Sequence, residues 1–258
     1  MDLITHALRA AQPPRPAALR PLERALVVGA GGRLGSALLA EALVGGRFQR
    51  VAAVVSGPLT SALRGLATLP AAALQTPLQA PVPTLGAEVG FIVFERERHS
   101  NGRDDAFLQP DVGDLPILAR ALHAGGVRRL LVVLPHAPAL LPQALKAGLA
   151  SLDEGAVAAL GFEHLVFVRA AQAAGAGTLG SALERFAGWW LSQLRWMVPA
   201  REQPLRAVKL AALVVLLARA LPQARPGTRV VPPELLWQAA VLSPEGPDAT
   251  LAAWLAQP

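Results

Sequence analysis

The residues Val28-Gly29-Ala30-Gly31-Gly32-Arg33-Leu34-Gly35 form a glycine-rich turn between two regular segments. A short apolar run, Ala25-Leu26-Val27-Val28, precedes the turn, and apolar residues recur at helical spacing from Leu34 to Val44 after it. A short continuous apolar run is typical of a strand buried on both faces of a sheet. The spacing Gly-x-x-Gly-x-x-Gly therefore predicts a strand, a tight turn and a helix in immediate succession.

Strand-like and helix-like segments alternate along the rest of the chain. Further strands are expected at 51–55, 89–94, 127–134, 164–168 and 228–231, and helices at 61–69, 112–123 and 140–160. This alternation predicts an α/β fold of the Rossmann type, a doubly wound parallel sheet with helices on both faces. Residues 24–258 are expected to form one domain whose part from about 180 to 258 is small and mostly helical. Residues 1–23 are proline-rich and are expected to form a flexible extension.

Composition narrows the classes of function. The chain has 258 residues, 53% of them hydrophobic, and no cysteine, which excludes disulfides and thiolate metal sites. Its five histidines are not spaced as metal ligands. The most apolar late stretch, 210–217, is far shorter than the roughly 20 residues of a membrane span. We therefore expect a cytoplasmic protein that has neither a metal site nor a membrane span.

The chain is basic, with a formal charge of +6 and a pI near 11.2. A basic balance can indicate a nucleic acid, an anionic membrane surface or a phosphate-bearing ligand. The arginines are spread along the sequence and are not interleaved with aromatic residues, so the charged stripe of a nucleic-acid-binding protein is missing. Almost all the positive charge is arginine, with Lys146 and Lys209 the only lysines, and alanine is abundant. A GC-rich genome produces this bias, so the charge by itself does not indicate a ligand.

The glycine turn has the chemistry of a dinucleotide-binding loop. Gly29 permits the tight turn, Gly32 lets the backbone approach a pyrophosphate, and Gly35 lets the helix pack close to the strand. The phosphates would then lie at the positive end of the helix dipole, beside free N–H groups. The alternative is a glycine-rich turn without a ligand. The expected cofactor-binding residues are Gly29, Ala30, Gly31, Gly32, Arg33, Leu34, Gly35, Ser56, Phe94 and Leu134.

The choice between NADP and NAD depends on the end of the second strand. NAD-binding proteins usually place an acidic residue there, on the ribose hydroxyls. Here the strand ends Val54-Val55-Ser56, and no acidic residue occurs from Ala42 to Ala87. Arginines, which pair with phosphate in bidentate geometry, are nearby in the sequence. NADP is therefore favoured, and NAD stays possible; the arginines in question are Arg33, Arg47, Arg50 and Arg64.

From about Ala25 to Leu242 the chain resembles the atypical short-chain dehydrogenase/reductases, notably the NmrA-like and Tat-interacting-protein-like branch. Three pieces in the same order carry the resemblance: Val27-Val28-Gly29-Ala30-Gly31-Gly32-Arg33-Leu34-Gly35, Gly125-Gly126-Val127-Arg128-Arg129-Leu130-Leu131-Val132-Val133 and Leu160-Gly161-Phe162-Glu163-His164-Leu165-Val166-Phe167-Val168-Arg169. The resemblance implies an NAD(P)-binding Rossmann domain. Arg169-Ala170-Ala171 departs from the Arg-Pro-Gly of the family.

Active members of that family use a serine, a tyrosine and a lysine, and the resemblance shows all three replaced. Laid on this chain without gaps, the pattern places the serine near Leu134 or Pro135, the tyrosine near Lys146 and the lysine near Ala150. The chain contains no tyrosine at all. The favoured function is therefore a non-catalytic or weakly catalytic dinucleotide-binding protein, such as a redox-responsive regulator or an assembly partner.

Two other functions stay open. The first is an NADPH-dependent oxidoreductase of a small carbonyl or quinone substrate, with Lys146 or His136 as the proton donor in place of tyrosine. The second is a scaffold that has lost its cofactor.

Two further segments could carry function. Phe186, Trp189, Trp190, Leu194 and Met197 share one helical face, which is either core or a surface for a partner or for self-association. The segment 95–105 is dense in both charge signs. It is expected to be a solvated loop with internal ion pairs, although the family resemblance places this loop beside the nicotinamide.

Overall fold

The computed structural model describes residues 22–59, 65–74, 86–95, 104–136, 151–171, 205–243 and 246–257. Within these residues, seven parallel strands form one sheet in the order β3-β2-β1-β4-β5-β6-β7. The order runs one way from β1 to β3 and the other way from β4 to β7, as in a doubly wound sheet. The strands are β1 (Leu22–Val28), β2 (Phe48–Val55), β3 (Leu66–Pro70), β4 (Val89–Val93), β5 (Arg129–His136), β6 (His164–Ala171) and β7 (Gly227–Val231).

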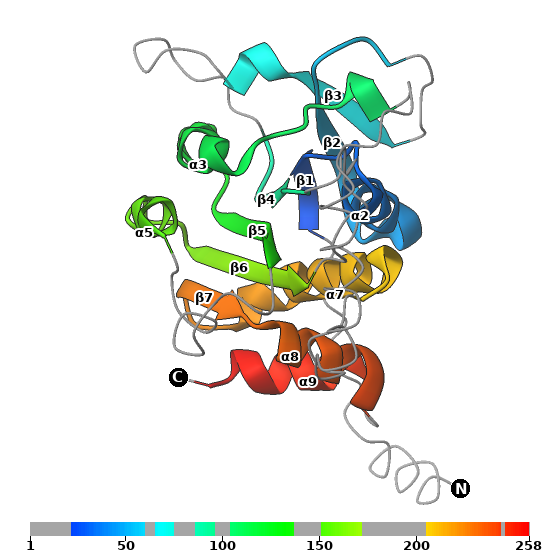
Figure 1. The fold of residues 1–258 in the computed structure, drawn as a ribbon, viewed down its shortest axis with the longest axis vertical. Helices are drawn as coiled ribbons and strands as arrows, with labels where there is room; N and C mark the ends of the chain where they lie inside the picture. Colours follow the sequence, from blue (N-terminus) through cyan, green and yellow to red (C-terminus); the bar gives the residue numbers. More distant parts are fainter. Residues whose placement is uncertain are drawn as a thin grey trace, which may run out of the picture.

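Helices cover both faces of the sheet (Figure 1). One face carries α2 (Arg33–Leu43), α7 (Ala207–Ala220), α8 (Pro233–Trp237) and α9 (Pro247–Leu255). The other face carries α3 (Leu115–Ala124) and α5 (Leu152–Ala158). The shorter helical turns are η1 (Val44–Gly46), η2 (Ala71–Leu74), η3 (Asp104–Ala106), η4 (Val112–Asp114), η7 (Leu221–Gln223) and η8 (Gln238–Leu242).

The core lies in two layers, one on each side of the sheet. Along β1, Ala25 and Val27 pack in the layer with α2 and α7, whereas Leu26 and Val28 pack in the layer with α3 and α5. All five residues of β4 are buried. Alternate residues of a strand point to opposite faces, so a strand between two helix layers must be apolar at every position. This is why the central strands read as unbroken apolar runs.

The structure confirms the predicted α/β fold and corrects one element. Strands lie at the six places where the sequence predicts them, and the predicted helices at 34–44 and 112–123 correspond to α2 and to η4 followed by α3. The helix predicted over 61–69 is wrong where the structure describes it, because Leu66–Pro70 is the edge strand β3. Pro70 disfavours helical geometry at Leu69 and is compatible with the end of an edge strand.

Some predictions fall on residues that the structure does not describe. These are the extension up to residue 21, the first part of the predicted helix 140–160 up to residue 150, the aromatic segment at 186–197 and Lys146. The described remainder of that predicted helix contains α5. In the last part of the chain, the described residues contain α7, α8 and α9 with β7 between them. The expectation of mostly helical structure with one strand agrees with these elements.

Candidate functional site

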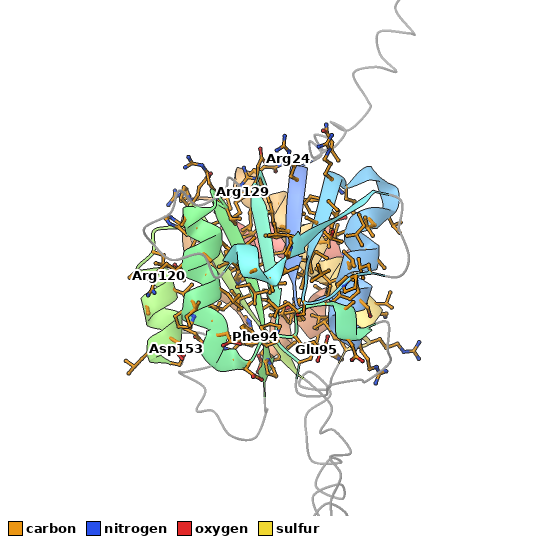
Figure 2. All side chains as sticks on the ribbon, turned by 90° about the horizontal axis from the view of Figure 1, so that it is seen from above. Arg24, Phe94, Glu95, Arg120, Arg129 and Asp153 are labelled. Carbon is orange, nitrogen blue, oxygen red and sulfur yellow. The ribbon has the colours of Figure 1, made fainter. Side chains whose placement is uncertain are left out.

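The glycine turn lies where the strand order reverses, between the carboxyl ends of β1 and β4. Gly29 directly follows β1, and Phe94 and Glu95 directly follow β4. Figure 2 shows Phe94 and Glu95 at one end of the strands, and Arg24 and Arg129 at the opposite end. In doubly wound sheets, ligands bind in the crevice outside the carboxyl ends at such a reversal. The topology therefore makes the carboxyl ends of β1 and β4 the expected place for a ligand.

Two of the three glycines are required by close packing of the backbone. Gly29 has φ +85°, and a Cβ atom there would collide with the carbonyl oxygen of Val93. A Cβ atom on Gly35 would collide with the carbonyl oxygen of Gly29. The first contact fixes the tight turn against β4, and the second lets α2 begin directly against the turn. Both roles agree with those assigned to these glycines from the sequence.

The third glycine faces a side chain. Gly32 is the N-cap residue of α2, with an extended backbone at φ −89°, and it makes no side-chain cap. A Cβ atom on Gly32 would collide with the carboxylate of Glu95. The same carboxylate accepts hydrogen bonds at Oε1 from the backbone N–H groups of Leu34, at 2.8 Å, and Gly35, at 2.7 Å. Glu95 thus fills the space that the absent side chain of Gly32 leaves open.

The electrostatics of this corner favour an anion. The first N–H groups of a helix lack partners within the helix, and the dipole places partial positive charge there. The first turn of α2 contains no acidic residue, so the negative charge comes from outside the helix. Glu95 is only partly exposed, and its oxygen lies at short, charge-assisted distances from two backbone donors. The geometry is suited to hold an anionic oxygen.

The other predicted cofactor-binding residues occupy different environments around this corner. Ser56 is exposed directly after β2, and its backbone N–H donates to the carbonyl of Ala106 at 2.8 Å. Ala30 and Gly31 are buried in the turn, whereas Arg33 is exposed at the first position of α2. The side chains of Phe94 and Leu134 are buried in the core layer with α3.

Of the two candidate proton donors, His136 lies on a described strand and Lys146 does not. His136 is the last residue of β5, so its backbone lies at the carboxyl edge of the sheet. Nothing is described of its side chain, and Lys146 lies outside the described residues. The role of either residue in catalysis stays a prediction.

The arginines nominated for a 2′-phosphate are separated by the fold. Arg47 follows α2 and forms an ion pair with Glu41 at 2.7 Å. Arg50 pairs in register with Arg24 on β1, at the amino edge of the sheet. Arg64 lies outside the described residues. Of the three that are described, Arg33 is the one at the carboxyl edge.

A buried ion pair near the same edge was not expected from the sequence. The guanidinium of Arg169, on β6, makes two hydrogen bonds to the carboxylate of Glu154, on α5, at 2.8 and 3.2 Å. Both side chains are 5% exposed. The hydroxyl of Ser151 accepts from the N–H of Glu154 and caps the same helix. This pair ties the first turn of α5 to β6.

Features that would indicate a metal centre or a membrane span are absent from the part of the chain that the structure describes. No group of His, Asp and Glu side chains there could hold a metal ion. No described helix is long and apolar enough to cross a membrane. His164 is buried at the amino end of β6, where burial lowers the pKa of its imidazole. That position is at the edge opposite the glycine turn.

Comparisons with known proteins find only distant similarity to solved structures. No protein-family model matches the chain, and no curated protein is significantly similar to it in sequence. The Bordetella bronchiseptica enzyme WbmH, solved with NAD+, is 15% identical with a TM-score of 0.46, over 88% of this chain and 83% of that one. The Lactococcus lactis oxidoreductase ylbE is 11% identical with a TM-score of 0.45, over 85% of this chain and 97% of that one.

A Rossmann-fold NAD(P)-binding family protein from Shigella flexneri is 15% identical with a TM-score of 0.35. The match covers 57% of this chain and 66% of that one, so this chain spans just under two thirds of its length. Similarities at this level carry no information on activity, substrate or partner.

Proposed function

We propose that this chain binds a nicotinamide dinucleotide at the carboxyl edge of its sheet, with the pyrophosphate at the N-terminus of α2. The observation that carries the proposal is the pair of backbone N–H groups, on Leu34 and Gly35, that converge on one carboxylate oxygen. They lie at the glycine turn, beside the reversal of strand order, where a dinucleotide fold presents its phosphate donors.

The phosphorylated cofactor is the preferred ligand in this proposal. Ser56, in place of an acidic residue, follows β2, so no carboxylate stands directly after this strand to hold a ribose 2′-hydroxyl or to repel a 2′-phosphate. Arg33 is exposed at the start of α2 and can supply a guanidinium to that phosphate. Arg47 and Arg50 are excluded from this role by their positions at the other edge.

The proposed role is non-catalytic or weakly catalytic, that of a redox-responsive regulator or an assembly partner. When bound, the dinucleotide supplies hydride chemistry, and the protein's share would be a positioned proton donor. General acid–base help is typically worth roughly 10²–10⁴-fold. The chain has no tyrosine to provide it, and Leu134, which stands near the expected serine, is buried in the core.

The test is a calorimetric titration with NADPH and with NADH. We expect dissociation constants in the micromolar range, with NADPH binding more tightly than NADH. Arg33→Ala should reduce the difference in affinity between the two cofactors. Gly32→Val should abolish binding, because its side chain would occupy the space of the phosphate. Gly155→Val is the matched control, since a Cβ atom at Gly155 meets nothing within 4 Å. Unchanged affinity in a folded Gly32→Val protein would contradict the proposal.

The weakly catalytic role is tested separately by a screen of carbonyl and quinone substrates with saturating NADPH and NADH. Little turnover is expected. Robust turnover that disappears in Lys146→Ala or His136→Ala would favour the oxidoreductase with a rearranged proton donor.

A further inference from the structure

A side chain of the protein occupies the proposed phosphate position at the start of α2. The carboxylate of Glu95 accepts from Leu34 and Gly35 and lies against Gly32, the glycine that would let a pyrophosphate approach the backbone. A phosphate oxygen bound at the start of α2 would need the same two N–H donors and the same space. The carboxylate and the pyrophosphate therefore cannot occupy this position together.

We propose that Glu95 is an internal competitor of the dinucleotide, an autoinhibitory side chain that imitates a phosphate oxygen and must leave before the cofactor binds. This inference rests on the proposed function, because it assigns a regulator to the same site. Glu95 lowers the affinity in two ways. Its hydrogen bonds to Leu34 and Gly35 must be broken, and its negative charge repels the pyrophosphate as long as it stays nearby.

The position of Glu95 in the chain makes such an exchange feasible. Glu95 comes two residues after the end of β4, so its backbone is attached to the buried centre of the sheet. Its side chain is only partly buried and reaches the donors from β4 rather than from α2. A change of the Glu95 rotamer can therefore withdraw the carboxylate without unfolding α2, because Glu95 is not part of that helix.

The other end of the same strand offers a matched control. Glu88 directly precedes β4, lies at the amino edge and forms a 3.7 Å ion pair with Arg129. At about 3.3 Å per strand residue, the two glutamates are roughly 20 Å apart. Glu88→Gln therefore removes the same formal charge from the molecule without touching the glycine turn. It separates a local competition from a general effect of net charge on the binding of an anionic ligand.

The experiment compares the wild type, Glu95→Gln, Glu95→Ala and Glu88→Gln by calorimetric titration with NADPH and NADH. Both Glu95 variants should bind at least about tenfold more tightly than the wild type, equivalent to about 1.4 kcal/mol, since the carboxylate no longer competes. Glu88→Gln should bind like the wild type. A wild type that fails to bind beside a Glu95 variant that binds would also support the inference.

Amide hydrogen exchange of the ligand-free proteins gives a second readout. Exchange at Leu34 and Gly35 should be several-fold faster in Glu95→Ala than in the wild type, since both N–H groups lose their acceptor. Unchanged exchange there, or equal affinity of the Glu95 variants and the wild type, would overturn the inference and leave dinucleotide binding standing. Failure of all four proteins to bind would overturn both the inference and the proposed function.

Discussion

The two edges of the sheet use charge in different ways. At the amino edge, Arg129 meets Glu88 and His164 meets Glu163, both at 3.7 Å, and both carboxylates are more than 40% exposed. At the carboxyl edge, Glu95 meets two backbone N–H groups at 2.7 and 2.8 Å.

The difference is between carboxylates that pair with side chains and a carboxylate that is held by backbone donors. In both amino-edge pairs the carboxylate is largely exposed and 3.7 Å from its partner, so the attraction is screened by solvent and contributes little, although Arg129 and His164 are themselves mostly buried. Backbone donors at the end of a helix have fixed positions, and they hold an anion without rearrangement. The nearby pair of Arg169 and Glu154, both 5% exposed, belongs to the same ordered edge. The carboxyl edge is therefore where substitutions should have specific consequences.

The largest effect is expected from breaking the buried ion pair. Arg169→Ala would remove both guanidinium hydrogen bonds from the buried Glu154 carboxylate, at a cost of about 3–5 kcal/mol in the free energy of unfolding. Glu88→Ala, which breaks the amino-edge pair with Arg129 at its exposed carboxylate, should cost no more than about 1 kcal/mol. Urea unfolding of both variants measures the contrast. Equal losses would show that the two edges do not differ in this respect.

A pair of glycine substitutions sharpens the same comparison. Gly29 and Gly161 have similar φ values, +85° and +80°, but a Cβ atom on Gly29 would collide with Val93, whereas one on Gly161 meets nothing within 4 Å. Gly161→Ala should therefore cost about 1 kcal/mol, for backbone strain alone. Gly29→Ala should cost about 2–4 kcal/mol, since steric overlap is added to the strain. Thermal unfolding checks both values, and a Gly29→Ala protein as stable as Gly161→Ala would contradict the observed turn.

The smallest effect concerns pH and the amino edge. Burial lowers the pKa of His164 below its ordinary value of 6.5; Glu163 opposes this shift, and Arg129 and Arg229 add to it. Below about pH 6.5 the unfolded chain binds the proton more readily than the folded protein does. Stability should therefore fall as the pH drops through this range.

Urea unfolding at about pH 7.5 and about pH 5 measures this dependence. His164→Gln should reduce the loss of stability between the two conditions. A pH dependence that is the same in His164→Gln and the wild type would assign it to other groups.

The sequence was sufficient to predict the turn and every strand of the described sheet except β3, because these features depend on local patterns. The apolar runs at 25–28, 89–94 and 127–134 and the glycines at 29, 32 and 35 carry that information directly. The edge strand β3 was missed because Leu66 and Leu69 have helical spacing, and a half-exposed strand next to one neighbour has a weak pattern. Residues 66–70 form a strand because they pair with β2, and this pairing is not visible in the local sequence.

The contacts of Glu95 and Arg169 could not be predicted from local patterns. Glu95 lies in a segment dense in charge that reads as a solvated loop, and its partners are 60 and 61 residues away in the chain. One signal was present: α2 begins with a glycine cap and has no acidic residue in its first turn, so its N–H groups need an outside acceptor. Choosing Glu95 as that acceptor requires the adjacency of β1 and β4.

The measurement that tests the central claim most directly is an NMR titration of the 15N-labelled protein with NADPH. The backbone amide signals of Leu34 and Gly35 should shift along one binding curve, because their N–H groups exchange a carboxylate for a phosphate. The amide signals of Arg129 and His164, at the amino edge, should stay in place. Shifts confined to the amino edge, or no shift with millimolar NADPH in the wild type and in Glu95→Ala alike, would contradict dinucleotide binding at the glycine turn.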